Sequence, residues 1–225
     1  VRLDSGDIAY LSRRVRERLD EAGFPQCRII ASNSLDEYII SDLLRQGAKV
    51  DAFGIGERLI TSKSDPVFGA VYKLAAVEDE AGRIIPKIKI SENVGKITTP
   101  HFKKVYRLRD RESGKAEADL ICIWDERIDD TRPLEIFDPE YTWKRKTLTD
   151  FTAHELLVPV FRGGKQIYKL PALDEIRAHC TAELDGVWDE VRRFTNPHNY
   201  YVDLSERLWH CRHDMIKAAR AKKSK

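Results

Sequence analysis

Short apolar runs alternate with helically spaced apolar positions along the start of the chain. The runs lie at residues 1–4, 27–31 and 49–53 and are typical of buried strands. Between them, apolar residues recur every three or four positions, which predicts helices over residues 8–19 and 39–44. Gly23 and Gly47 follow these stretches as C-terminal stops. The β-α-β-α-β order predicts an α/β fold, either about half of a (β/α) barrel or part of a doubly wound sheet.

Two of the predicted helix starts carry candidate capping residues. Ser34-Leu35-Asp36-Glu37 matches a capping box, in which Ser34 and Glu37 satisfy each other's free backbone N–H groups. Asp7 stands directly before the helical pattern that begins at Ile8, where aspartate is a preferred N-cap. We therefore expect Ser34 to cap the second helix, and Asp7 to be either a cap or a ligand-binding group.

After Pro66 the pattern changes to that of antiparallel strands. Three hairpins are predicted from apolar runs separated by polar or glycine-containing turns. They pair residues 72–78 with 84–90, 104–110 with 118–124, and 151–161 with 166–169. Two helices close the chain. The first carries apolar residues from Leu173 to Val191 on one face, and the second follows a capping box at Asp203-Leu204-Ser205-Glu206.

These patterns divide the chain into three segments. We expect residues 1–68 to form the C-terminal half of the α/β barrel, and residues 69–170 to form antiparallel strands that join a preceding domain. Residues 171–225 are expected to form the C-terminal helices and a basic tail. Because half a barrel leaves unpaired strand edges, we also expect the chain to begin inside a larger enzyme.

The composition narrows the classes of partner. Apolar residues make up 42% and charged residues 34% of the 225, the balance of an ordinary soluble globular protein. With 39 basic against 37 acidic side chains, the chain lacks the excess charge of a general nucleic-acid binder. No stretch approaches the roughly 18 apolar residues of a membrane span. The four scattered cysteines form no CxxC pair, so we expect reduced thiols, no zinc site and a cytoplasmic location.

Polar and glycine-rich residues follow each of the three predicted parallel strands. They are Asp4-Ser5-Gly6-Asp7, Ser32-Asn33-Ser34 and Gly54-Ile55-Gly56-Glu57. The C-terminal ends of parallel strands meet at one edge, and such edges commonly bind phosphate. Glycines let the backbone approach an anion closely, and hydroxyl and amide side chains add hydrogen bonds. Each group also has a structural interpretation as a turn or a helix cap.

The charged residues at these strand ends suit other parts of a phosphorylated ligand. Asp4 and Asp7 repel phosphate, but they suit ribose hydroxyls or a Mg²⁺ ion that bridges to a diphosphate. Arg2 can bind a carboxylate or a phosphate in bidentate fashion. An arginine on a strand more commonly serves an ion pair, so both interpretations of Arg2 stay open.

Six segments of the chain together resemble nicotinate phosphoribosyltransferases. They are RLDSGD (2–7), ASNSLDE (31–37), GIGERL (54–59), GAVYKL (69–74), PKIKISEN (86–93) and DPEYTWKRK (138–146). They follow the family's order and cover the C-terminal portion of its length. The resemblance implies a type II phosphoribosyltransferase barrel, and formation of nicotinate mononucleotide and diphosphate from nicotinate and phosphoribosyl diphosphate. It also implies coupled ATP hydrolysis, Mg²⁺, a place in NAD salvage and a homodimer.

The resemblance implies roles for residues at the first strand end. Arg2 matches a family arginine near the nicotinate carboxylate, which fits bidentate recognition. Asp4, Ser5 and Asp7 lie in the stretch that faces the ribose and the diphosphate. Asp4 or Asp7 is accordingly the expected indirect contact to Mg²⁺.

The other two strand ends match the cradle of the ribose 5′-phosphate. Ser32, Asn33 and the backbones of Gly54 and Gly56 are the residues implied. Many relatives have a threonine at Glu57, and a carboxylate cannot repeat the contact of a hydroxyl with phosphate. We expect the backbone N–H of Glu57 to meet the phosphate and its side chain to turn outward to Arg58.

Two groups that the family needs lie upstream of RLDSGD: the histidine that ATP phosphorylates and the aromatic residue that stacks on the pyridine ring. None of the six histidines matches that site, so no catalytic residue is assigned here and the isolated chain is expected to be inactive. Three alternatives remain. They are a nicotinamide or quinolinate phosphoribosyltransferase, a non-catalytic phosphate-binding fragment, and an unrelated phosphate-binding barrel enzyme.

Overall fold

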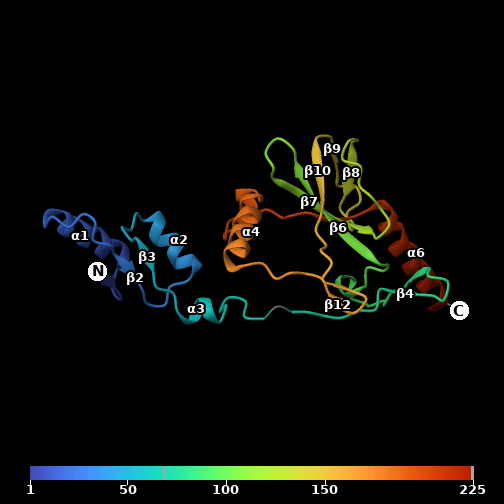
Figure 1. The fold of residues 1–225 in the computed structure, drawn as a ribbon, viewed down its shortest axis with the longest axis horizontal. Helices are drawn as coiled ribbons and strands as arrows, with labels where there is room; N and C mark the ends of the chain where they lie inside the picture. The colour runs from blue at the N-terminus through green and yellow to red at the C-terminus, as the bar shows by residue number, and fades with distance from the viewer. Residues whose placement is uncertain (68, 224–225) are drawn as a thin grey trace. The chain divides into compact units, whose positions relative to one another are not determined.

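The computed structural model describes residues 1–67 and 69–223 (Figure 1). The chain is a mixed α/β protein with six α-helices among the described residues. It divides into two units, Val1–Val71 and Tyr72–Lys225, each with its own sheet. Each unit is therefore described by itself.

The first unit contains the predicted β-α-β-α-β order. Its strands are β1 (Arg2–Leu3), β2 (Ile30–Ala31) and β3 (Ala52–Phe53), and its helices are α1 (Ile8–Glu21), α2 (Glu37–Arg45) and α3 (Glu57–Ile60). All three strands are parallel, in the order β1-β2-β3, with Leu3 opposite Ala31 and Ala31 opposite Phe53. The parallel arrangement confirms the prediction, although each strand spans only two residues.

The helices of the first unit pack their apolar faces against the central strand. Ala9 of α1, Ala31 of β2 and Leu43 of α2 lie in one buried cluster together with Leu35. Ala31 and Leu35 are almost completely buried. Burial of this apolar surface, rather than the short ladders, supplies most of the stability of the unit.

One predicted helix cap is confirmed and one is wrong. Asp7 caps α1, because its carboxylate accepts the N–H of Tyr10 at 2.9 Å. Ser34 does not cap α2: Asn33 and Ser34 have φ angles of 87° and 51°, and the helix begins only after them. Asp36 is the cap instead, and its carboxylate accepts the N–H of Ile39 at 2.9 Å.

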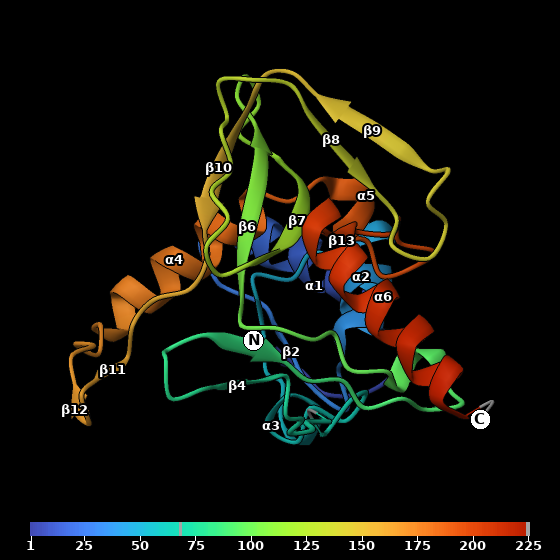
Figure 2. The same cartoon turned by 90° about the vertical axis from the view of Figure 1, so that its right-hand side faces the viewer.

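The second unit is built on a four-stranded sheet in the order β10-β6-β7-β13 (Figure 2). Its strands are β6 (Lys103–Asp110), β7 (Ala116–Ile123), β10 (Phe151–Glu155) and β13 (Val202–Leu204). The β6–β7 hairpin confirms the second predicted hairpin, and a register shift occurs between Leu108 and Arg109. β10 pairs antiparallel with β6, whereas β13 pairs parallel with β7. The parallel strand β13 was not predicted from the sequence.

Three smaller antiparallel pairs complete the second unit. They are β4 (Ala76–Glu78) with β5 (Ile84–Pro86), β8 (Leu134–Phe137) with β9 (Arg145–Leu148), and β11 (Phe161–Arg162) with β12 (Lys165–Gln166). The first confirms a predicted hairpin, and β8–β9 was not predicted. The expected continuous strand over residues 151–161 is wrong: residues 151–155 form β10, which pairs with β6, and only Phe161, in β11, pairs with β12. A short 3₁₀ helix, η1 (Val94–Lys96), follows β5.

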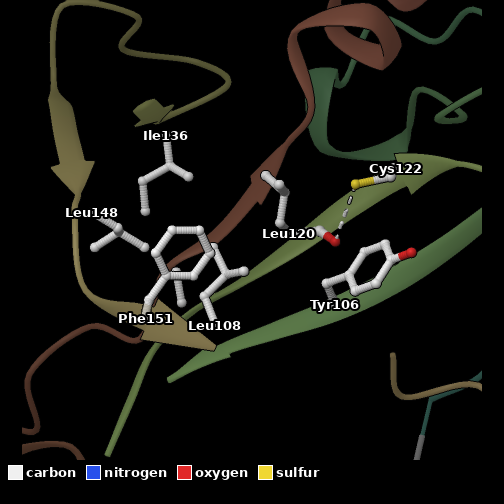
Figure 3. Close-up of a cluster of buried hydrophobic side chains, with 8 residues drawn as sticks. Tyr106, Leu108, Leu120, Cys122, Ile136, Leu148 and Phe151 are labelled. Atoms are coloured by element: carbon white, nitrogen blue, oxygen red, sulfur yellow. Dashed lines mark hydrogen bonds between the residues drawn. The ribbon is translucent and has the colours of Figure 1, made fainter. Parts of the chain in front are cut away.

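The β8–β9 hairpin covers the main sheet of the second unit through a shared apolar core (Figure 3). Leu108 of β6 and Leu120 of β7 meet Ile136, Leu148 and Phe151 there. Leu108 and Phe151 are almost completely buried. Side chains from five strands therefore hold the sheet and the hairpin together.

The C-terminal helices differ from prediction at two points. The expected helix over 173–191 is divided into α4 (Leu173–Asp185) and α5 (Asp189–Arg192), because Gly186 ends α4. The last helix, α6 (Glu206–Lys223), is capped by Ser205, whose hydroxyl accepts the N–H of Leu208 at 3.2 Å. Asp203 cannot be its cap, since it lies within β13. β13 and α6 thus belong to the same unit as the antiparallel strands.

Candidate functional site

The three parallel strands of the first unit bring their C-terminal ends to one edge. The Ser32 N–H donates to the Leu3 carbonyl at 2.9 Å, and the Gly54 N–H donates to the Ala31 carbonyl at 2.8 Å. These bonds place the residues after β1, β2 and β3 side by side, with β2 in the middle. The three polar and glycine-rich loops predicted to bind a ligand, which follow β1, β2 and β3, therefore lie next to one another.

A hydrogen-bonded chain of three side chains crosses this edge. The Ser32 hydroxyl donates to the Asp4 carboxylate at 2.6 Å, and the Arg2 guanidinium pairs with the other Asp4 oxygen at 3.2 Å. The Asp4 and Arg2 side chains are 53% and 66% exposed, so both reach solvent and a ligand can approach them. The ion-pair interpretation of Arg2 thus holds here, while most of its N–H donors stay available.

The remaining groups after β1 have different surroundings. Asp7 uses one carboxylate oxygen to cap α1, so it is partly committed to the helix. Gly6 has a φ of 76°, and a Cβ there would lie 3.1 Å from a Leu11 methyl carbon. Ser5 is exposed. The loop therefore needs glycine at its turn and leaves the Ser5 hydroxyl on the surface.

Backbone geometry distinguishes the loop after β2. Asn33 and Ser34 are consecutive residues in the left-handed region, which asparagine tolerates better than most residues. Both side chains are exposed, so the buried core does not require this conformation directly. Strained backbone of this kind gathers at ligand-binding loops.

The loop after β3 approaches the loop after β2 closely at Gly54. A Cβ on Gly54 would lie 3.4 Å from the Ser32 Cβ, so a larger side chain would press on Ser32. Gly56 precedes α3 with open space around it and forms no side-chain cap. Both glycines therefore leave backbone accessible where a side chain would cover it.

Glu57 turns outward, as expected, but its partner differs from the expected one. Its carboxylate is 72% exposed and pairs with Lys63 at 3.1 Å. Arg58 instead pairs with Asp36, the cap of α2. The short helix α3 directs Arg58 to α2, and this ties the loops after β2 and β3 together.

The ion pair between Asp36 and Arg58 was not predicted from the sequence, although both residues flank the loops expected to bind phosphate. The N–H of Ile39 and then the charge of Arg58 hold the pKa of Asp36 below its usual range, against the opposing effect of partial burial. A cavity of about 170 Å³ beside this pair is lined by Asp36, Glu37, Tyr38, Arg58, Lys63 and Ser64. The strand-end residues Asp4, Ser32 and Gly54 do not line it.

The described part of the chain has neither a metal-binding cluster nor a membrane-spanning helix. Residues 1–67 and 69–223 contain no group of three or more histidine, cysteine, aspartate or glutamate side chains placed to hold a metal ion. All four cysteines are free thiols. No described helix is long and apolar enough to cross a membrane.

Residues 102–212 match the family described as "Nicotinate phosphoribosyltransferase C-terminal domain". The nicotinate phosphoribosyltransferase of Bacillus subtilis is 43% identical over 209 residues, which are 93% of this chain and 42% of that protein. The enzyme of Dictyostelium discoideum is 33% identical over 230 residues, covering 96% of this chain and 38% of that protein.

A solved structure has the same fold. The crystal structure of human nicotinic acid phosphoribosyltransferase aligns with a TM-score of 0.70 and 26% identity, over 96% of this chain and 40% of the human chain. The chain thus spans about two fifths of the length of the curated relatives it matches. By its sequence and its fold, the chain belongs to the nicotinate phosphoribosyltransferase family.

Proposed function

We propose that the protein containing this chain transfers a phosphoribosyl group from phosphoribosyl diphosphate to nicotinate, forming nicotinate mononucleotide and diphosphate. The observation that carries the proposal is the convergence of Asp4, Ser32 and Gly54 at one edge of a parallel sheet. The family membership of the chain supports the same reaction. NAD salvage is the setting in which this product is used.

The ribose 5′-phosphate is proposed to lie against the loops after β2 and β3. The exposed Asn33 amide and the uncovered backbone at Gly54 and Gly56 favour an anion there. The Ser32 hydroxyl donates to Asp4 in the free structure, so it must rotate to donate to phosphate. The Glu57 side chain takes no part, since its carboxylate pairs with Lys63.

The ribose hydroxyls and the diphosphate are proposed to lie near Asp4, Ser5 and Asp7. Asp4 has an exposed carboxylate, and carboxylates accept hydrogen bonds from sugar hydroxyls. These two aspartates also fit Mg²⁺, because that ion is commonly held by one or two carboxylates, waters and substrate phosphates. Bound there, Mg²⁺ would neutralise charge on the departing diphosphate.

Arg2 is proposed to bind the nicotinate carboxylate. Its exposed guanidinium uses one N–H toward Asp4 and keeps the others for a planar partner. In the reaction the pyridine nitrogen bonds to the ribose anomeric carbon as the bond from that carbon to diphosphate breaks. This chain would act by holding the sugar phosphate in place for an oxocarbenium-like transition state.

The wider architecture is also part of the proposal. The parallel strands of the first unit would continue into a (β/α) barrel, since the relatives are more than twice as long as this chain. We further propose coupling to ATP hydrolysis and a homodimer, on family grounds. Four free thiols suit the reducing cytoplasm.

The test is the base specificity of the intact protein with phosphoribosyl diphosphate, Mg²⁺ and ATP. We expect nicotinate mononucleotide by chromatography, and a kcat/KM for nicotinate at least about tenfold above that for nicotinamide or quinolinate. Equal or faster use of either other base would replace the proposal with a sister phosphoribosyltransferase. No turnover of any base would favour a non-catalytic role.

A further inference from the structure

The second unit contains a cavity that the proposed reaction does not use. It has a volume of about 350 Å³ and lies between the β8–β9 hairpin and β13. Ile136, Phe137 and Tyr201 supply apolar surface, Asp138 and Asp203 supply carboxylates, and residues 144–146 are basic. The volume lies in the range of small-molecule pockets, about 300–1,000 Å³.

Asp203 is a buried carboxylate without a counter-ion. Its side chain lines the cavity from β13, and the residue is 4% exposed. Among the described residues, none hydrogen-bonds to or pairs with its carboxylate. Burial, together with the charge of Asp138, raises the pKa of Asp203 to about 6. Burying an unpaired charge is costly, so a cation placed beside Asp203 would stabilise its charged form.

The basic residues on the cavity wall do not supply that partner. Each is engaged elsewhere: Arg145 with Glu135, Lys146 with Glu117, and Lys144 over the rings of Tyr141 and Trp143. The Lys144 ammonium lies 4.5 Å from the centre of the Tyr141 ring. The lining therefore has two carboxylates. Among the described residues, Asp203 has no cation beside it, and Asp138 feels the charge of Lys144 but forms no ion pair with it.

Asp138 is held in place but keeps one oxygen available. Its Oδ1 accepts the N–H groups of Glu140 at 2.8 Å and of Tyr141 at 2.9 Å. The N–H of Tyr141 is the main cause that lowers the pKa of Asp138, so this carboxylate stays charged. A donor that enters the cavity can therefore reach one fixed anion and one buried anion.

We propose that this cavity binds a primary ammonium group between the Asp203 and Asp138 carboxylates, with its carbon chain against Ile136, Phe137 and Tyr201. An ammonium supplies positive charge and three N–H donors, which match the unpaired carboxylate oxygens. The ammonium can belong to a small-molecule amine or to a lysine side chain elsewhere in the protein. The inference does not rest on the proposed reaction.

The test uses n-butylammonium chloride and the intact protein labelled with ¹⁵N-tryptophan. The Trp209 indole N–H is a local reporter, because it donates to the Pro139 carbonyl at 2.9 Å and its ring contacts Phe137. We expect a saturable shift of this signal with a dissociation constant on the order of 1 mM. n-Butanol, which has the same length without the charge, should give no saturable shift.

Variants assign the binding to the cavity. Asp203→Asn keeps the shape and removes the charge, and should weaken n-butylammonium binding by about tenfold or more. Asp138→Ser keeps a side-chain acceptor for the N–H groups of Glu140 and Tyr141 but removes the charge. It should also weaken n-butylammonium binding. Asp129→Asn is the control, because Asp129 is exposed, pairs with Arg132 and does not line the cavity.

The two sources of the ammonium give different results. A small-molecule site gives the titration described. A lysine already in the cavity gives no titration, but that lysine resists reductive methylation in the wild type and reacts in Asp203→Asn. Absence of both results, or equal binding of n-butanol, would overturn the proposal. None of these readouts measures nicotinate turnover, so failure here is separate from failure of the proposed reaction.

Discussion

At the residue scale, Asp4 links two strand ends through its side chain, and we propose that the same carboxylate faces the ribose of the substrate. It accepts the Ser32 hydroxyl from β2 and pairs with Arg2 on its own strand. Because these side chains are largely exposed, the contacts contribute little to stability. In the proposed function, these contacts position the polar groups for the ligand.

Substitutions of Asn33 separate the contribution of its backbone conformation from that of its side-chain amide. Its φ of 87° and exposed side chain mean that Asn33→Gly should keep or slightly raise the free energy of unfolding, whereas Asn33→Val should lower it by about 1–2 kcal/mol. Chemical denaturation measures both. If the amide binds the 5′-phosphate, Asn33→Gly will also raise the KM for phosphoribosyl diphosphate while stability is kept. An unchanged KM would show that Asn33 has only a structural role in the turn.

Asp203 should make amine binding depend on pH. Its pKa is about 6, so the carboxylate is charged at pH 7 and mostly protonated at pH 5, and n-butylammonium should bind about tenfold more weakly at pH 5. Asp138 stays charged over this range because its pKa is lowered, and Tyr201 and residues 144–146 are the other polar groups on the cavity. Titrations of the Trp209 signal at both pH values measure the change. Equal affinity at the two values would contradict this assignment.

Residue-level prediction from sequence succeeded where a single local bond decides the outcome. Asp7 next to an apolar helix start was identified as a candidate cap, and the structure has that bond. Ser34 failed as a cap because the backbone turns left-handed at Asn33 and Ser34, which a pattern of residue types does not reveal. Arg58 pairs with Asp36, the N-cap residue of α2, rather than with Glu57, and this is a tertiary contact that a local pattern does not reveal. The roles expected for the strand-end residues toward ligands stay predictions.

At the element scale, α4 is attached to the main sheet by charged side chains. Arg107 of β6 pairs with Asp119 of β7, and Arg107 and Arg109 both pair with Glu183 of α4. The Tyr200 hydroxyl donates to Asp119 at 2.8 Å. These groups are half-buried. Removing one member of the network therefore lowers the stability more than breaking a surface ion pair does.

Gly186, at the end of α4, should not tolerate a side chain. A Cβ there would lie 2.2 Å from an Arg109 guanidinium nitrogen, so Gly186→Ala must shift the end of the Arg109 side chain and disturb its hydrogen bond to Gly114 and its pair with Glu183. We expect a loss of about 1–3 kcal/mol in the free energy of unfolding by urea denaturation. Gly69→Ala is the matched control, because a Cβ at Gly69 meets nothing within 4 Å. Equal stability of the two variants would show that Arg109 is not held by α4.

Hairpins were predictable where the sequence contains two apolar runs separated by a recognisable turn. The β6–β7 hairpin surrounds Glu112-Ser113-Gly114-Lys115, and the β4–β5 hairpin has its turn at Gly82. The β8–β9 hairpin was missed because a loop of seven residues separates two short strands. β13 was missed because it joins the sheet through a parallel neighbour far away in sequence. Such partners depend on tertiary packing rather than on local pattern.

At the scale of the whole molecule, the chain combines two units with different sheet architectures. The first unit places three loops along one parallel edge, and the second forms an antiparallel sheet with its own core. The six segments that suggested the family come from both units, so membership does not depend on one loop. The proposed reaction depends on the first unit, and the amine site on the second.

The most direct test of the central claim is the rate of nicotinate mononucleotide formation by the intact protein as phosphoribosyl diphosphate is varied. The wild type should form the product. Asp4→Asn should lower kcat/KM for phosphoribosyl diphosphate by about tenfold to a hundredfold, because an amide replaces the carboxylate that we propose to face the substrate. Asp20→Asn is the control, because Asp20 is an exposed carboxylate of α1 that pairs with Arg16 of the same helix, and it should leave the rate unchanged. Absence of product, or an unchanged rate in Asp4→Asn, would contradict the account.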